Sequence, residues 1–387
     1  MDEIRIGVAG LGPRARGTWI PLLQRIPGFR ITALCDPLGP LLDLARARMD
    51  SPSTVQTYQA YDELLADPQV DAVALTVRSA RQGDLAAQAL EAGKHVHAEV
   101  PAAHSIEDCW RIVRAVERTG RTYQLAEQTR YWGFVDVWRS LVASGQLGRI
   151  TLCEGQYFHH HVAGMFQDPH TGDLLGPDAL SAHPDARPTW AQQMPPIHYL
   201  PHELGPMLRV LDDRVTQVVA MGTDAHSAVD PAIAQPDMQV ALMRTQKGTL
   251  LRMAASFAQP HPDGNWHWYQ VLGTGGRVEW SRGAGDRPKQ WLAGAELSDL
   301  TEADWSYART DVPPEARGSG HGDADYYTHV AFRDAVLAGR QPDFDVYQAM
   351  DTAAPAVLAA ESIARGSELL SVPDFRPHPG RQKGEGT

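Results

Sequence analysis

The first 125 residues alternate between short apolar runs and amphipathic segments. Four runs have the length and composition of buried strands: 4–9, 29–35, 72–76 and 95–99. Three segments between them have the apolar spacing of helices: 15–25, 41–49 and 83–92. Strands that alternate with helices predict βαβ units, and therefore a parallel sheet covered by helices.

The pattern changes after about residue 125. A helix is predicted at 132–144, and strand-like segments with Gly or Pro in their turns follow it at 150–158, 214–222, 238–245, 249–257, 266–272 and 277–280. Such a series predicts a mostly antiparallel sheet. Two further helices are predicted at 326–338 and 347–365. The stretch 166–196 is rich in Pro, Asp, Gly and His, and we expect a long loop there.

Composition excludes several classes of protein. Hydrophobic residues make up 43% of the 387 residues and charged residues 21%, an ordinary globular balance. A net charge of −12 repels phosphate backbones, so we expect no nucleic-acid partner. We expect no membrane span and no secretion signal, because the chain has no long apolar run and starts MDEIRIGVAG. Three widely spaced cysteines favour a reducing, cytoplasmic location over a disulfide framework.

A glycine-rich turn joins the first predicted strand to the first predicted helix. Its residues fit the pattern G-x-G-x-x-A: Gly10, Leu11, Gly12, Pro13, Arg14 and Ala15. The first glycine permits a tight turn, the second lets the backbone approach a pyrophosphate, and the small Ala15 permits close helix packing. Asp36 ends the second strand, where a carboxylate binds a ribose diol and repels a 2′-phosphate. The set predicts NAD as cofactor, and a purely structural turn is the alternative.

The expected fold class is α/β: an N-terminal Rossmann doubly wound parallel sheet plus a C-terminal α+β domain with a large, mostly antiparallel open sheet. The expected division is an NAD-binding domain at 1–125, a substrate and oligomerisation domain at 126–375 and a loose tail at 376–387. Thr76 and Glu99 end two further strands at the cofactor edge and are assigned to the cofactor, although Glu99 can also bond only to neighbouring backbone.

Two further features make the chain resemble the Gfo/Idh/MocA oxidoreductase family over nearly its whole length. One is the segment AGKHVHAEVP at 92–101, and the other is the two-domain order with Gly-Arg-Ile at 148–150 before the second sheet. Dehydrogenases of that family usually have Glu-Lys-Pro where this chain has Glu-Val-Pro. Val100 can neither donate a proton nor carry charge, so the chain departs from the dehydrogenase pattern at this position.

Several segments resemble one branch of that family, the NAD-dependent glycosidases of glycoside hydrolase family 109. They are EVP at 99–101, YFH at 157–159, YLPHELGP at 199–206, GHG at 320–322, DVY at 345–347 and VPDF at 372–375. Gln128 follows Glu127 where the branch carries Glu-Asn near the cofactor, which implies cofactor contact for Gln128 and Val100. The segment QMPP at 193–196 differs from the branch, so the resemblance implies no particular sugar.

The resemblance implies a redox-neutral hydrolysis. In that branch NAD⁺ takes a hydride from C3 of the sugar, the C2 proton and the C1 substituent are lost, water adds, and NADH returns the hydride. Tyr157 and His159 are two apart on a predicted strand and face the same side, so they are candidates for the C2 base and the leaving-group acid. His202, just before a predicted helix, is assigned to the C3 hydroxyl, and Tyr199 and His321 to substrate binding.

The candidate residues also have simpler interpretations. Tyr157 can be a sheet residue whose hydroxyl caps a neighbour, and His321 can belong to a turn. His159 and His161 share a strand face and can share a metal with Asp168 or His170, but the related branch needs none, so no metal is assigned.

Two more features of the sequence allow more than one interpretation. His198 and His202 have helical spacing, yet Pro201 between them argues against a zinc pair. The aromatic residues of the late strands either pack against the sheet or form a subunit interface: Trp266, Trp268, Tyr269 and Trp280. An open sheet that needs covering predicts a homodimer or homotetramer.

The expected function is an NAD-dependent glycoside hydrolase that acts on a small carbohydrate glycoside. The alternative is an NAD-dependent sugar or polyol dehydrogenase of the Gfo/Idh/MocA family, against which Val100 weighs. A catalytically inactive, NAD-binding regulatory protein is disfavoured because the chain has polar side chains at Tyr157, His159 and His202. An acidic or sulfonated sugar is a further alternative, and four arginines are candidates to bind it: Arg78, Arg81, Arg130 and Arg187.

Overall fold

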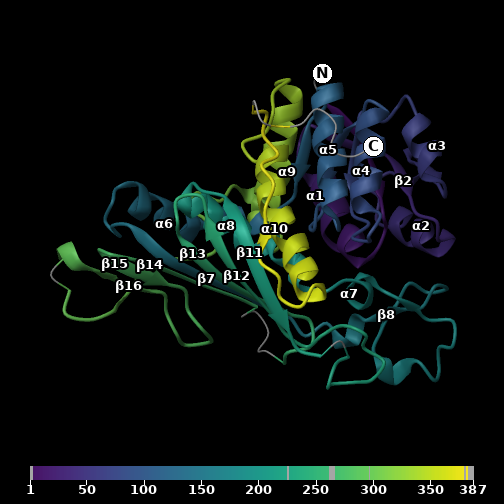
Figure 1. Ribbon diagram of the computed structural model, residues 1–387. Coiled ribbons are helices and arrows are strands. Elements are labelled where there is room, and N and C mark those ends of the chain that lie inside the picture. Colours follow the sequence, from purple (N-terminus) through teal and green to yellow (C-terminus); the bar gives the residue numbers. More distant parts are fainter. Residues whose placement is uncertain (1–2, 225, 261–265, 296, 379–380, 382–387) are drawn as a thin grey trace.

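The computed structural model describes residues 3–224, 226–260, 266–295, 297–378 and 381 (Figure 1). Its N-terminal half contains a six-stranded sheet in the order β3-β2-β1-β4-β5-β6. The strands are β1 (Ile4–Ala9), β2 (Phe29–Cys35), β3 (Gln56–Tyr58), β4 (Ala72–Leu75), β5 (His95–Ala98) and β6 (Tyr123–Leu125). All of these pairings are parallel. The strand order reverses between β1 and β4, which places a crevice at their carboxyl ends.

Helices connect the strands of this sheet: α1 (Ile20–Arg25), α2 (Gly39–Arg46), α3 (Tyr61–Ala66), α4 (Gln82–Glu91) and α5 (Ile106–Thr119). A π-helical turn at Ala15–Trp19 precedes α1, so the predicted helix at 15–25 begins with a wide turn. The strands β3 and β6 were not predicted, because three residues are too few to show a pattern.

The C-terminal half contains a nine-stranded sheet in the order β17-β16-β15-β14-β7-β13-β12-β11-β18. Its strands are β7 (Ile150–Phe158), β11 (Val215–Gly222), β12 (Gln239–Thr245), β13 (Leu250–Ser256), β14 (His267–Gly273), β15 (Gly276–Glu279), β16 (Lys289–Leu292), β17 (Thr301–Glu302) and β18 (Leu370–Ser371). The β7–β13 pair is parallel and the others are antiparallel. The predicted fold class is therefore confirmed.

Helices cover one side of the large sheet and connect it to the first (Figure 1). The sheet is covered by α6 (Gly133–Ala143), α8 (Pro201–Leu211) and α10 (Val346–Ala364), whereas α9 (Ala324–Leu337) packs against β1, β5 and α1 of the N-terminal half. Phe332 of α9 is buried in the same apolar cluster as Ile6 and Leu11 of the N-terminal half. Helix α9 thus brings the C-terminal part of the chain to the glycine-rich turn.

The stretch 166–196 is more ordered than the predicted long loop. β8 (Phe166–Gln167), β9 (Leu174–Leu175) and β10 (Arg187–Pro188) form a small sheet, and α7 (Trp190–Gln193) follows. Strands of two residues leave no alternating pattern in the sequence, so these short elements within the loop were not predicted. Asp168 accepts the His170 N–H at 2.7 Å and lies 2.9 Å from Nδ1 of His183. Its carboxylate therefore stabilises the turn within this segment.

Aromatic residues of the late strands pack inside the chain. Tyr269 and Trp280 are buried against Phe134 of α6, with ring centroids 5.8 and 4.3 Å apart. Trp268 is also buried. These three residues therefore pack against the sheet and do not form a subunit interface.

The residues beyond 375 are anchored where the structure describes them. Arg376 forms a two-bond ion pair with Asp351, and Arg381 pairs with Glu117. Residues 379–380 and 382–387, which belong to the expected loose tail, lie outside the described residues. No helix in the described part of the chain is long and apolar enough to cross a membrane.

Candidate active site

The turn after β1 leaves open space beside Gly12. Gly10 has a φ of 87°, and a Cβ there would lie 2.9 Å from the backbone of Thr76. A Cβ on Gly12 would meet nothing within 4 Å. The hydroxyl of Thr76 donates to the Ala9 carbonyl at 3.1 Å and ties the end of β4 to the turn. Gly10 is therefore required by the turn itself, whereas the space at Gly12 suits a pyrophosphate.

Asp36 at the end of β2 faces the same turn. Its Oδ2 accepts the Leu11 N–H at 2.8 Å and its Oδ1 accepts the Leu38 N–H at 2.9 Å. Burial raises the pKa of Asp36, and both hydrogen bonds oppose that shift. Each oxygen keeps a lone pair for a ribose hydroxyl. Pro13 starts the first helical turn and Ala15 is buried beneath it, so the residues present fit a dinucleotide.

Arg14 is a largely buried cation shared by two carboxylates from different halves of the chain. Its Nε donates to Oε2 of Glu99 at 2.8 Å, and its Nη2 donates to Oδ1 of Asp325 at 2.6 Å. Nε1 of Trp19 also donates to Oε2 of Glu99, at 2.7 Å. Burial alone would raise the pKa of Glu99, but the Arg14 charge and these hydrogen bonds lower it to about 2. The side chains of Arg14 and Glu99, both assigned to the cofactor, thus bind each other at the crevice.

Asp325 links Arg14 to His321. Nδ1 of His321 lies 2.8 Å from Oδ2 of Asp325, and Nε1 of Trp132 donates to the His321 carbonyl at 2.7 Å. His321 has a φ of 47°, a backbone conformation that residues other than glycine rarely adopt. The Trp132 ring lies 5.1 Å from the His267 ring, which itself lies 6.2 Å from the His159 ring, so His321 lies next to the cluster of rings that contains His159.

Rings from β7, β14 and α8 gather around Tyr157. The Tyr157 ring centroid lies 4.4 Å from that of His159 and 5.3 Å from that of His202. Tyr199 and His267 lie 5.4 and 5.2 Å from the same ring. Tyr157 and His159 stack because alternate residues at the end of β7 face the same side. The structure therefore brings together four assigned residues and adds His267.

The carboxylate of Glu127 holds His202. Nδ1 of His202 lies 3.0 Å from Oε1 of Glu127, and the same oxygen accepts the Thr129 N–H at 3.0 Å. Both side chains are buried, with His202 5% and Glu127 0% exposed. A proton on Nδ1 that faces Glu127 leaves Nε2 as an acceptor, which is the form of a general base. His202 is the second residue of α8 and not a residue before the helix, because Pro201 occupies the first helical position.

Glu203 and His267 form a second buried pair. Nδ1 of His267 lies 2.8 Å from Oε1 of Glu203, and the Tyr269 hydroxyl donates to the His202 carbonyl at 2.9 Å. Burial, with the charge of Glu127, raises the pKa of Glu203, and burial lowers the pKa of His267. Both shifts favour the neutral groups, so the short contact is a hydrogen bond between the carboxyl group and the imidazole.

Tyr157 and His159 are both neutral at ordinary pH. Burial raises the pKa of Tyr157 well above its usual value. Burial and the neighbouring imidazoles lower the pKa of His159 far below its usual value. In the resting state Tyr157 is therefore a proton donor and His159 a proton acceptor.

Arg78 is the cation of this cluster. Its Cζ lies 4.9 Å over the Trp190 ring, and its charge opposes the raised pKa of Tyr157. Its Nε is buried and has no hydrogen-bond partner in the described structure. Of the other arginines considered for an acidic sugar, Arg81 and Arg187 are exposed. Arg78 is therefore the one of these three that is placed to meet a ligand.

The remaining assigned residues are buried. Val100 is fully buried after β5, and Gln128 is buried with an Oε1 that has no partner among the described residues. Among the described residues, no group of three or more His, Cys, Asp or Glu side chains is arranged to hold a metal ion. His198 lies against His104, with ring centroids 5.3 Å apart.

Sequence reasoning missed four residues of the cluster: Glu203, His267, Asp325 and Trp190. A signal was present for Glu203, which directly follows His202 in the segment YLPHELGP. His267 and Trp190 carry no local signal, because a distant strand and a short helix bring them in.

Two sequence profiles match the chain. Residues 4–127 match that of the oxidoreductase family with an NAD-binding Rossmann fold, and residues 137–379 match that of the glycosyl hydrolase 109 C-terminal domain. A glycosyl hydrolase family 109 protein of Streptomyces niveus is 28% identical over 97% of this chain and 78% of that protein.

Solved structures of low sequence identity share the fold. Levoglucosan dehydrogenase in complex with NADH and L-sorbose matches with a TM-score of 0.74 at 18% identity, over 97% of this chain and 100% of that one. An oxidoreductase from Agrobacterium radiobacter, in complex with NAD⁺, L-tartaric acid and magnesium, matches with a TM-score of 0.71 at 18% identity, over 95% and 98%.

Proposed function

The chain belongs to the glycosyl hydrolase 109 family and carries an NAD-binding Rossmann domain, and from this premise we propose that it hydrolyses a small carbohydrate glycoside by a redox-neutral route. The observation that carries the proposal is the buried His202–Glu127 pair, which stands beside Tyr157 and His159. Such a set offers a base, an acid and a second acceptor in one cluster.

The cofactor is proposed to lie along the turn after β1. Gly12 leaves room for the pyrophosphate, Asp36 offers its oxygens to a ribose, and Val100 gives an apolar wall. Thr76 ties the end of β4 to the turn after β1. The amide oxygen of Gln128 has no partner among the described residues and can accept a hydrogen bond from the cofactor. Bound NAD would supply the hydride acceptor, and later the hydride donor, at C3 of the sugar.

His202 is proposed to handle the C3 hydroxyl. As C3 loses its hydride, the proton of its hydroxyl passes to Nε2 of His202, and Glu127 stabilises the resulting imidazolium across Nδ1. When the hydride returns to C3, the same proton goes back to the oxygen. The histidine and the oxidation state of the sugar carbon are both restored at the end of the cycle.

Tyr157 and His159 are proposed to serve C1 and C2. The ketone at C3 acidifies the C2 proton, which neutral His159 takes while the C1–O bond breaks. Tyr157, which its raised pKa keeps protonated, gives its proton to the leaving oxygen. Water then adds to the C1–C2 double bond: Tyr157 takes a proton from the water as the hydroxyl of the water bonds to C1, and His159, after exchange with solvent, returns a proton to C2. Both residues regain their starting forms, and the net reaction is hydrolysis.

An assay with aryl glycosides separates this function from that of a sugar or polyol dehydrogenase. The protein is incubated with a panel of aryl glycosides and NAD, and phenol release and NADH absorbance are followed together. Phenol release without net NADH supports the glycosidase. Stoichiometric NADH from free sugars contradicts it and supports the dehydrogenase.

The open side of the large sheet is proposed to form a homodimer or homotetramer. Met221, Leu242 and Leu250 are 69%, 55% and 49% exposed on β11, β12 and β13. Apolar residues exposed together on a sheet are typical of an interface. Sedimentation of the full chain tests this, and a monomer at all concentrations contradicts it.

The boundary between the NAD-binding domain and the second domain, between residues 125 and 126, is also a proposal.

A further inference from the structure

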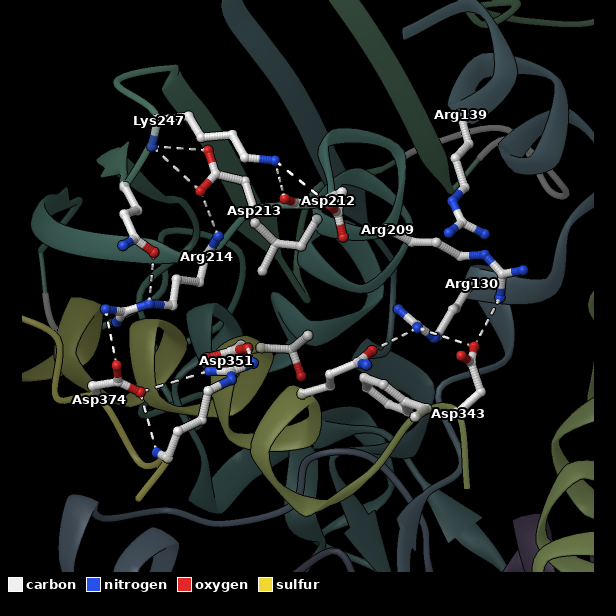
Figure 2. A pocket seen from close by; sticks show the side chains of 16 residues that line it. Arg130, Arg139, Arg209, Asp212, Asp213, Arg214, Lys247, Asp343, Asp351 and Asp374 are labelled. Carbon is white, nitrogen blue, oxygen red and sulfur yellow. Dashed lines mark hydrogen bonds and ion pairs between the residues drawn. The ribbon is translucent and has the colours of Figure 1, made fainter. Parts of the chain in front are cut away.

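A cavity of about 640 Å³ lies at the C-terminal end of α8. Figure 2 shows that three arginines from three different elements lie next to one another at one side of it. They are Arg130 of the 3-10 turn Gln128–Tyr131, Arg139 of α6 and Arg209 of α8. No residue of the Tyr157 cluster lines this cavity, and seven residues of α8, about 10 Å, separate Arg209 from His202.

The three guanidinium groups are short of counter-charge. The carboxylate of Asp343 lies 3.6 Å from Arg130 and 4.0 Å from Arg209, but this side chain is 76% exposed. Asp136 pairs with Arg209 at 3.1 Å and is shared with Arg309. Arg139 has no ion pair within the described residues. Like charges that converge without equal counter-charge repel one another, and a bound anion relieves this repulsion.

Two of these arginines also have buried hydrogen-bond donors without a partner in the described structure. Nε of Arg130 and Nε of Arg209 are both buried and unpartnered. The Arg130 side chain is held in place, since its Nη2 donates to Oε1 of Gln348 at 2.7 Å and its Cζ lies 4.4 Å over the Phe344 ring. Burial, with the charges of Arg209 and Arg139, lowers the pKa of Arg130 to about 10. A buried donor without an acceptor costs free energy, which an oxyanion would recover.

The opposite wall of the cavity carries no surplus positive charge. Arg376 binds Asp351 through two hydrogen bonds, and Arg214 lies 3.0 Å from Asp374. Figure 2 shows Arg214, Asp351 and Asp374 across the cavity from the three arginines. The surplus positive charge is therefore confined to the side of the three arginines, and the rest of the wall offers polar groups to the body of a ligand.

We infer that this cavity binds a small molecule that carries a compact oxyanion (a phosphate ester, sulfate or carboxylate), held by Arg130, Arg139 and Arg209 outside the catalytic cluster. A planar guanidinium matches the paired oxygens of these groups. The cavity volume is that of a small-molecule site. The binding does not depend on the glycosidase reaction, so its test uses no turnover.

Calorimetric titration of the full chain, saturated with NAD to occupy the dinucleotide site, tests the inference. The probes are inorganic phosphate, sulfate, citrate, glucose 6-phosphate and, as the neutral control, glucose. At least one of the four anions is expected to bind, and glucose is expected not to bind. The anion that binds with the highest affinity identifies the charged group of the ligand. Variants Arg139→Gln and Arg209→Gln are expected to bind that anion about ten-fold more weakly, because each loses a charge-assisted hydrogen bond.

Arg139 is exposed, so its variant keeps the test valid if Arg209→Gln fails to fold. The matched control is Arg287→Gln, which removes an exposed arginine that pairs with Asp304 away from the cavity. The control is expected to bind like the wild type. Absence of anion binding, equal affinity in Arg139→Gln and the wild type, or an equal loss in Arg287→Gln would each overturn the inference.

Discussion

Nδ1 of His202 lies 3.0 Å from the carboxylate of Glu127, and these two residues come from the two halves of the chain. Glu127 follows β6, the last strand of the parallel sheet, and His202 begins α8 of the second domain. The proposed base is therefore assembled only when the two sheets are in place. The cofactor crevice and the proposed proton acceptor are held together by this contact and by the Arg14–Asp325 pair.

Glu127→Gln is expected to lower kcat by about 100-fold, which is typical for the loss of general-base support. The amide keeps the shape of the side chain but cannot stabilise an imidazolium. NAD binding, measured by fluorescence titration, is expected to stay unchanged. His202→Ala is expected to lower kcat to a similar extent, and the double variant to be little worse, because the two residues act as a unit. Full activity in Glu127→Gln would contradict the assignment.

Gly12→Val and Gly10→Ala are expected to fail in different ways. A Cβ at position 12 would meet no protein atom within 4 Å, so Gly12→Val is expected to keep the unfolding free energy of the NAD-free chain but to weaken NAD binding by about 100-fold or more. At position 10 the added Cβ meets the Thr76 backbone at positive φ, so Gly10→Ala lowers the unfolding free energy by about 1–3 kcal/mol. Urea unfolding and NAD titration measure both. A Gly12→Val variant that binds NAD normally would remove the dinucleotide from this turn.

The carboxylate of Glu99 is expected to stabilise the fold in a pH-dependent way. Its pKa is lowered from 4.5 to about 2 in the folded chain, so its contribution is fully present above pH 4.5 and is lost as the pH falls through about 2. Between these limits the wild type is expected to lose about 3 kcal/mol that Glu99→Gln does not lose. Urea unfolding of both proteins at several acidic pH values measures the difference. Parallel pH profiles would show that Arg14 does not stabilise the Glu99 charge.

Tyr157→Phe and His159→Ala are each expected to abolish turnover of an aryl glycoside while NAD stays bound. Tyr157→Phe keeps the stacked ring and removes only the hydroxyl proton, so the loss reports on chemistry and not on packing. Thermal unfolding of the two variants serves as the control for folding. Normal rates in both variants would refute their assigned roles.

Much of the fold is visible in the sequence, because apolar alternation and glycine-rich turns are local. The strand at 150–158 was predicted with the bounds that β7 has. Helix α5 was not predicted, although the Ser105 hydroxyl accepts the Asp108 N–H and Gly120 ends the helix in the left-handed region. Such capping residues indicate where a helix begins and ends, and a prediction from apolar spacing alone leaves them out.

The site was less predictable than the fold, because its contacts join residues far apart in the chain. Spacing along β7 puts Tyr157 and His159 on one face, and the structure stacks them. Spacing cannot show that Arg14 and Glu99 bind each other, since 85 residues separate them. It likewise gives no reason to place His267 next to Glu203.

The most direct test of the redox-neutral route is turnover of an aryl glycoside in D₂O, followed by NMR of the released sugar. The route removes the C2 proton to a base and returns it from solvent, whereas the C3 hydride stays within the protein. The account predicts deuterium at C2, protium at C3, and no net NADH. A product that keeps protium at C2 would show direct displacement at C1 and would contradict the account.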